Sequence, residues 1–344
     1  MEPVIWYVIL YVLFALYFIF EAYEWGAGMV YGLYASDDDE KLKVLSSVKS
    51  IWAANEVWLL AFVGLSYVVF PVFFQSISSF FKGLFFVFVF VYMLQIISSN
   101  LLRVFFERRI RPLFEWIYVL SSFALTLIAG LFVALLFRGD VRGDMPLWSR
   151  HFSPFAEPKG YMDYFVLLFL MLFLVIVMLN GLGWVVHRSS GAFGRKLKFK
   201  VQKLAVAGIV LVIINVVISY FINARPLATK AHWIAWLVFV ILMLGSLGGL
   251  MMIRTYQKDN KGFFLATNLF VYFWVAFLLR QYPYLIFSGE SEGGISVFRT
   301  VFRSLKSYHL QWWTIGIALV LFVYSILVHK FSKGHALLTA QRKK

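Results

Sequence analysis

The sequence predicts an all-α integral membrane protein that crosses the bilayer about nine times. Hydrophobic residues make up 62% of its 344 residues, and charged residues make up only 14%. A soluble protein cannot bury that much apolar surface, whereas a polytopic membrane protein exposes it to lipid. The apolar residues are grouped in long runs with few charges, which is the pattern of membrane-spanning helices.

Each predicted span is long enough to cross a bilayer as a helix, which takes about 20 residues. We expect the spans at 3–34, 50–74, 80–102, 113–137, 162–187, 203–223, 230–253, 262–287 and 310–331. The first would measure about 48 Å as a helix, so it should emerge from the hydrocarbon into solvent. No connection is long or polar enough to form a separate soluble domain, so 1–344 is predicted to be a single polytopic membrane domain.

The distribution of Lys and Arg predicts the orientation of these spans. The odd-numbered connections and the C-terminal tail carry 21 of the 32 basic residues, and the even-numbered connections carry 10. The positive-inside rule therefore predicts an N-terminus outside and a C-terminus in the cytoplasm. The formal charge of +15 follows from this bias and does not indicate a nucleic-acid partner. No basic residue precedes the first span, so we expect it to be retained and not cleaved as a signal peptide.

Two carboxylates interrupt the first predicted span. Glu21 and Glu24 are three residues apart, so on a helix they lie on one face, one turn from each other. Inserting a charged side chain into a membrane costs about 2.5–3.5 kcal/mol on insertion scales, so such residues face a protein interior, a wet cavity or a proton route. The alternative is that the apolar run ends at Phe20 and both acids lie among lipid head groups.

Two further acids lie near the cytoplasmic ends of other spans. Glu56 is near the start of the second span, and Glu115 is near the start of the fourth. The predicted orientation brings all four carboxylates to a similar depth on the cytoplasmic side, and we predict that they carry protons. For Glu107, beside Arg108 and Arg109, an interfacial ion pair is the simpler interpretation.

We expect no cofactor to be bound by this chain. It has no cysteine, which excludes disulfides, cysteine-ligated iron–sulfur clusters and thiolate metal sites. Its six histidines fall in loops or at the ends of spans, whereas a haem needs an axial ligand inside the bundle. Arg280, inside the eighth span, either extends to the outer head-group region or contacts a partner subunit, a lipid or a quinone head group.

Four short motifs occur in order along the chain, each within or beside a predicted span. They are Glu21-Ala-Tyr-Glu-Trp-Gly-Ala-Gly28, Trp52-Ala-Ala-Asn-Glu-Val-Trp58, Arg111-Pro-Leu-Phe-Glu-Trp116 and Tyr282-Pro-Tyr284. Together they resemble subunit II of the cytochrome bd quinol oxidases. That family usually carries Asp-Gly-Phe-Asp-x-Gly-x-Gly in its first helix and Trp-Asp-Gly-Asn-Glu/Gln-Val-Trp in its second.

The chain departs from this pattern in its acids. Both aspartates of the first motif are glutamates here, Glu21 and Glu24. The acid after the signature tryptophan, usually credited with proton intake, is Ala53, which cannot carry a proton. Glu56 is the nearest substitute, one helical turn from Trp52.

The resemblance implies a fold and a set of partners. The fold is two four-helix bundles, here 1–137 and 162–287, with a peripheral ninth helix at 310–331. The main partner is a haem-bearing subunit I with haem b and haem d, where quinol is oxidised and dioxygen is reduced to water. Small single-helix subunits, a structural quinone, the quinone pool and membrane lipid are further partners that it allows. The location implied is the prokaryotic cytoplasmic (inner) membrane.

The resemblance and the residue types together assign expected roles to particular positions. Subunit II usually binds no haem, but it supports subunit I and lines a proton route. The proton-pathway residues are expected to be Glu21, Glu24, Glu56 and Glu115. The residues expected to serve packing or the subunit interface are Trp25, Gly26, Gly28, Trp52, Asn55, Trp58 and Trp116, because small and amide residues suit close helix contacts.

Two other functions fit the same residues. In a stand-alone secondary transporter or proton channel, the acids would couple substrate movement. Such proteins break helices near mid-membrane, whereas Pro71 and Pro283 lie near the ends of spans. In a purely structural companion subunit, the acids would have no role.

Overall fold

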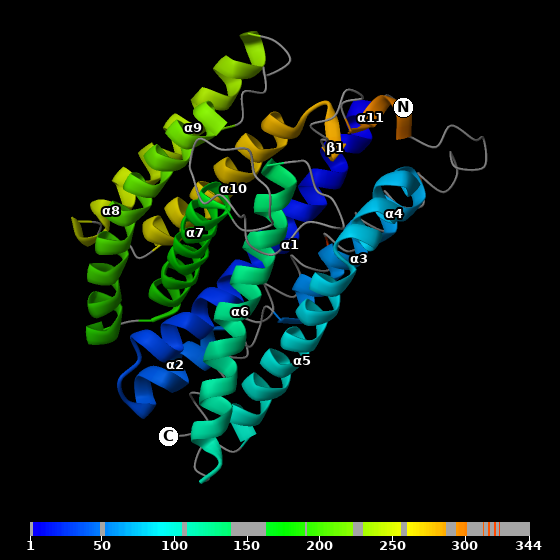
Figure 1. The fold of residues 1–344 in the computed structure, drawn as a ribbon. Helices are drawn as coiled ribbons and strands as arrows, with labels where there is room; N and C mark the ends of the chain where they lie inside the picture. The colour runs from blue at the N-terminus through cyan, green and yellow to red at the C-terminus, as the bar shows by residue number, and fades with distance from the viewer. Residues whose placement is uncertain are drawn as a thin grey trace.

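The computed structural model describes eight continuous stretches of the chain and four isolated positions (Figure 1). These are residues 3–48, 52–104, 109–138, 163–189, 191–222, 230–255, 260–286 and 294–300, with positions 312, 316, 320 and 323. The described residues are almost all helical, which confirms the prediction that the protein is all-α. Apart from the isolated positions, the expected ninth helix at 310–331 lies outside the described residues.

Seven helices in the described part are long and apolar enough to cross a membrane. They are α1 (Pro3–Leu33), α5 (Lys82–Val104), α6 (Arg111–Arg138), α7 (Tyr164–Arg188), α8 (Gly191–Ile222), α9 (Lys230–Met251) and α10 (Asn260–Gln281). Their positions agree with seven of the predicted spans to within a few residues, except that α8 begins at Gly191 and not near 203. The basic stretch 195–203, expected in a loop, is therefore helical.

The predicted second span, 50–74, is not one continuous helix. The chain forms α3 (Trp52–Val69) and α4 (Pro71–Phe80), and the two helices are bent by 120° relative to each other. Pro71 is the first residue of α4, and Phe70 before it has left the helical region (φ −125°, ψ 59°). A proline disfavours helical geometry in the residue that precedes it, so the break falls at Phe70.

A short helix that we did not predict, α2 (Asp38–Val48), follows α1. Asp38, Asp39 and Glu40 fill its first turn, where negative charge is favourable at a helix N-terminus. Its far end is held by α7, because the Trp184 indole Nε1 donates a hydrogen bond of 3.0 Å to the Ser47 carbonyl oxygen. This helix therefore lies against the transmembrane helices and is not a free loop.

Helix α1 lies in the middle of the molecule (Figure 1), where it packs against α3, α6, α7 and α10. Its crossing with α7 is close because two glycines meet there. A Cβ atom on Gly26 would lie 2.5 Å from the Val177 carbonyl oxygen and 2.6 Å from Gly181 Cα. Helices α8 and α9 lie on one side of this centre, and α3, α4 and α5 lie on the other (Figure 1).

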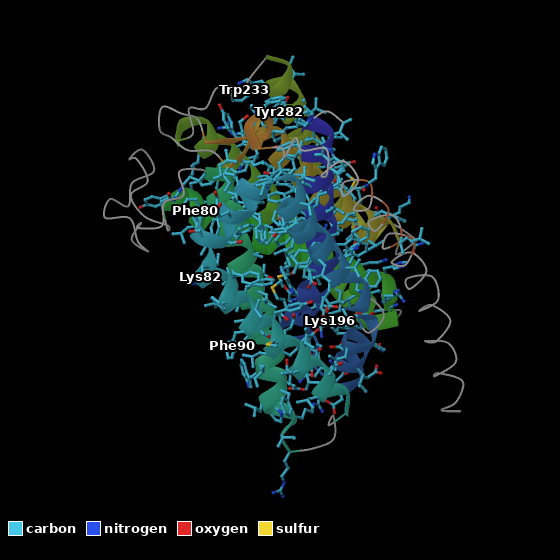
Figure 2. All side chains as sticks on the ribbon, turned by 90° about the vertical axis from the view of Figure 1, so that its right-hand side faces the viewer. Phe80, Lys82, Phe90, Lys196, Trp233 and Tyr282 are labelled. Carbon is cyan, nitrogen blue, oxygen red and sulfur yellow. The ribbon has the colours of Figure 1, made fainter. Side chains whose placement is uncertain are left out.

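The outward faces of α4 and α5 are strongly apolar. Phe80 and Phe90 project from this side (Figure 2), and the exposed fraction of Phe90 is 63%. After α10 the chain forms a two-stranded antiparallel sheet of β1 (Tyr284–Ile286) and β2 (Ile295–Ser296), followed by α11 (Val297–Thr300). A 3₁₀ turn, η1 (Ile253–Thr255), follows α9.

Candidate functional site

Glu21 and Glu24 lie inside the protein, on the central helix α1. Their exposed fractions are 0% and 3%, and every residue from Glu21 to Tyr31 is buried. Helix α1 does not end near Phe20 but continues to Leu33, so it carries both acids into the helix bundle. Carboxylates in such an environment need polar partners from neighbouring helices.

Tyr92 of α5 provides such a partner and joins two of the predicted acids. Its hydroxyl lies 3.2 Å from Glu21 Oε1 and 3.3 Å from Glu56 Oε1 of α3. Glu21 is fully buried, whereas Glu56 is only partly buried. Three helices thus bring two carboxyls and one phenol to a single point. We call Glu21, Glu24, Glu56 and Tyr92 the acid cluster.

We did not predict Tyr92 from the sequence, although a signal was present. Tyr92, Gln95 and Ser99 recur at three- and four-residue spacing within an otherwise apolar segment. That spacing places them on one face of a helix, which indicates a polar stripe facing the protein interior. In the structure Gln95 and Ser99 are buried, with exposed fractions of 0% and 3%.

Other buried polar atoms lie on the same helices as the acid cluster. The Tyr17 hydroxyl, one turn before Glu21, has no hydrogen-bond partner among the described residues. Both polar atoms of the Asn55 amide are likewise buried without a partner, beside Glu56 in the sequence. The Gln95 side-chain amide donates a 3.4 Å hydrogen bond to Ser122 Oγ, while its amide oxygen Oε1 has no described partner. Buried polar atoms are normally bonded to protein or water, so this interior is suited to ordered water.

Glu115 has a different environment. It accepts hydrogen bonds from Lys41 Nζ at 2.9 Å, Arg111 Nε at 2.7 Å and the Tyr31 hydroxyl at 2.8 Å. Arg111 also binds Asp38, and this guanidinium lowers the pKa of the Asp38 carboxyl. In the part of the chain described here, no hydrogen bond links Glu115 to the acid cluster. It instead ties α6 to α1 and α2.

The described cations do not pair with Glu21 or Glu56. Within the stretches that the structure covers, neither carboxyl lies in an ion pair with Lys, Arg or His. This contrasts with Glu115, which has two such partners. Unlike Glu115, Glu21 and Glu56 are therefore not held by a described cation.

The predicted packing residues fall in several environments. Gly26 lies against α7, and Gly28 lies against Ser122 and Tyr118 of α6, so both faces are occupied by the chain itself. Trp25 is fully buried, and Trp58 stacks on Phe20 at 6.3 Å between ring centroids. Two other predicted residues differ from these: Trp116 is 66% exposed, and the side chain of Trp52 lies outside the described residues.

Arg280 and one of the six histidines, His187, are the last of the candidate residues. Arg280 lies in the last turn of α10 with an exposed fraction of only 7%, so most of its side chain lies within the protein. His187, at the end of α7, stacks on Phe263 at 5.2 Å between ring centroids. Among the residues that the structure covers, no group of three His, Cys, Asp or Glu side chains could hold a metal ion.

The fold and the acid cluster together define a polytopic, all-helical membrane protein with carboxylates gathered in its interior. The family model for cytochrome bd terminal oxidase subunit II matches residues 2–331, so the chain belongs to this family. The resemblance predicted from the motifs is thereby confirmed.

Two individual proteins are similar to this chain. The cytochrome bd ubiquinol oxidase subunit 2 of Bacillus subtilis (strain 168) is 24% identical over 207 residues, which cover 58% of this chain and 57% of that protein. The match thus spans little more than half the length of this relative. The structure of bd oxidase from Geobacillus thermodenitrificans aligns with a TM-score of 0.67 at 12% identity, covering 96% of this chain and 98% of that one. This second likeness shows that the fold is shared.

Proposed function

We propose that this chain acts as the non-haem subunit of a quinol:dioxygen oxidoreductase in the prokaryotic cytoplasmic membrane. Haem b and haem d would lie in a subunit I partner, where quinol is oxidised and dioxygen is reduced, and no catalysis is expected from this chain alone. Family membership supports this proposal. The described histidine side chain, His187, lies at a helix end, which also suits a subunit that leaves the haems to its partner.

In this proposal the acid cluster carries protons from the cytoplasm toward the partner. Reduction of dioxygen to water consumes protons, and in a bilayer they need titratable groups and water to reach a buried site. The observation that carries the proposal is the link of partly exposed Glu56 to fully buried Glu21 through Tyr92. Glu56 would receive the proton and so take the role of the acid that the family usually carries at the position of Ala53.

Glu115 would serve at the cytoplasmic mouth of this route. Its ion pairs with Lys41 and Arg111 hold it in place near the ends of α1, α2 and α6. A carboxylate fixed by two cations is suited to attracting and ordering water more than to accepting a proton itself. Glu24, one turn from Glu21 on α1, would extend the route inside the protein.

We also propose the two-bundle architecture and the predicted orientation. The packing of α1 with α3 and α6, and of α5 with α6, supports a first bundle within 1–137. The packing of α7 with α8 and α10, and of α9 with α8 and α10, supports a second within 162–287. Helix 310–331 would be the peripheral ninth. The partner subunit would cover the face formed by α3 and α5, because both helices carry residues of the acid cluster and expose apolar side chains such as Leu60 and Phe90.

The test is turnover of the purified complex after Glu56→Gln, which keeps the hydrogen-bonding shape but cannot titrate. We expect quinol oxidation to slow by at least about tenfold with haem content unchanged, since positioned proton-transfer groups typically contribute 10²–10⁴-fold. The matched control is Glu40→Gln, which changes a glutamate of α2 that pairs with Lys196 outside the acid cluster. Parental turnover in Glu56→Gln, Glu24→Gln and the double variant would contradict the proposal and favour a purely structural companion.

A further inference from the structure

The position of Tyr92 suggests more than a buried hydrogen bond. Its phenol oxygen lies within hydrogen-bond distance of both Glu21 and Glu56, and the two carboxyls come from different helices. The ring stacks on Phe88 at 5.9 Å between centroids with an interplanar angle of 8°. This contact fixes the phenol between the acids, because both side chains belong to α5 and lie one turn apart.

The number of hydrogens available limits the protonation states in which Tyr92 can bond to both Glu21 and Glu56. A phenol has one hydrogen to donate and lone pairs with which to accept. Tyr92 can therefore donate to only one of Glu21 and Glu56 at a time. For both contacts to be hydrogen bonds, the carboxyl that does not accept from Tyr92 must itself be protonated and donate its hydrogen to the phenol oxygen. The geometry thus holds one proton between two carboxyls.

We propose that Tyr92 is a proton-relay residue between Glu56 and Glu21, an inference that rests on the proposed proton route. Protonated Glu56 donates to the phenol oxygen while the phenol donates to the Glu21 carboxylate. The Glu56 proton moves to the phenol oxygen as the phenol proton moves to Glu21. One O–H bond breaks and one forms at the phenol, which stays neutral, and the net result is one proton carried from Glu56 to Glu21. Once Glu21 has passed its proton on and Glu56 has taken up another, a turn of the hydroxyl back toward Glu21 resets the relay.

The surroundings support a relay more than a fixed structural bond. No hydrogen bond joins Glu21 directly to Glu56 within the residues that the structure covers, so the phenol is the described connection. The second oxygen of Glu21, Oε2, is buried and has no described partner. It therefore remains able to accept or pass on a proton after the relay has acted. Glu56 is partly exposed, so it can exchange with the outside of the bundle.

The experiment compares Tyr92→Phe with Tyr23→Phe in the assembled complex. Tyr92→Phe removes only the bridging oxygen and keeps the ring against Phe88. Tyr23→Phe removes a different buried hydroxyl, which lies on α1. This hydroxyl hydrogen-bonds to Thr267 of α10 at 2.9 Å and to neither acid. We expect Tyr92→Phe to slow turnover by about tenfold, or about 1.4 kcal/mol in the barrier, and Tyr23→Phe to leave it unchanged.

A second measurement separates a relay from a structural role. Infrared difference spectra with isotopically labelled glutamate report the protonation and hydrogen bonding of carboxyl groups. We expect Glu56→Gln to shift the Glu21 carbonyl band, because the phenol redirects its single hydrogen. This readout needs no Tyr92 variant, so it still decides the matter if Tyr92→Phe lowers haem content.

The outcomes distinguish this inference from the function on which it rests. Slow turnover in Tyr92→Phe together with a shifted Glu21 band supports the relay. Parental turnover in Tyr92→Phe with slow turnover in Glu56→Gln overturns the relay and leaves the proton route standing. An unshifted Glu21 band in Glu56→Gln also overturns it. Parental turnover in Tyr92→Phe, Glu56→Gln and Glu24→Gln together overturns both proposals.

Discussion

Gly26 and Gly181 determine how closely α1 and α7 approach. The two backbones meet so tightly that a Cβ on either residue would overlap the other helix. Small residues at helix crossings are typical of membrane proteins, where close packing replaces the hydrophobic effect between helices. Because α1 also carries Glu21 and Glu24, this crossing positions the acids relative to the rest of the molecule.

We predict that Gly26→Ala and Gly181→Ala each destabilise the complex, because the added methyl group meets backbone atoms that cannot move aside. Overpacking of this kind costs about 1–3 kcal/mol. The control is Gly64→Ala in α3, where a Cβ meets nothing within 4 Å. A glycine-to-alanine change in an unhindered helix is favourable by about 0.5–1 kcal/mol. Thermal unfolding in detergent measures both effects, and equal midpoints for Gly26→Ala and Gly64→Ala would contradict the prediction.

At the scale of helices, α6 and α7 are joined by a buried ion pair. Arg138 ends α6 with an exposed fraction of 3%, and its Nη1 lies 2.7 Å from Asp163 Oδ2. Asp163 is also the N-cap of α7, because its other carboxylate oxygen accepts a 2.8 Å hydrogen bond from the Val166 backbone N–H. The Asp163 carboxylate therefore caps the N-terminus of α7 and also neutralises the charge of Arg138 at the end of α6.

We predict a graded loss of stability when Asp163 is changed. Asp163→Asn can keep the cap but removes the negative charge from the buried pair with Arg138, and breaking a buried ion pair costs about 3–5 kcal/mol. Asp163→Ala also loses the cap, which adds about 0.5–2 kcal/mol. Asp39→Asn is the control, because its pair with Lys43 is exposed and contributes little. Unfolding midpoints that place Asp163→Asn level with Asp39→Asn would show that the buried pair is not needed.

At the scale of the whole molecule, we expect the two ends of the helix bundle to lie on opposite sides of the membrane. Trp233 and Tyr282 lie toward one end of the molecule, and Lys196 lies toward the other (Figure 2). The end with Lys196 also holds α2 and the ion pairs of Glu115. In the orientation that we propose from the basic residues, that end faces the cytoplasm.

We predict that Asp39→Cys and Phe298→Cys react with a membrane-impermeant thiol reagent from opposite sides. The native chain has no cysteine, so each variant carries a single reactive site. Both positions are exposed, Asp39 in α2 and Phe298 in α11. In intact cells or spheroplasts only Phe298→Cys should react, and in inside-out vesicles only Asp39→Cys. The reverse pattern would invert the proposed orientation and the direction of the proton route.

The sequence by itself determined the membrane class, most of the spans, the embedded acids and the family. These features are local, because hydropathy, span length and short motifs can be read within one helix. The break at Phe70 and the helix α2 were missed, although Pro71 and the acidic run at Asp38 are local signals of both.

Only the tertiary structure decided which side chains meet. The contact of Tyr92 with Glu21 and Glu56 joins three helices, and the pairing of Glu115 with Lys41 joins α6 to α2. Such contacts depend on the rotation and register of each helix against its neighbours, which packing at positions such as Gly26 and Gly181 determines. A pattern within one helix gives the depth of an acid in the membrane but not its partner across the bundle.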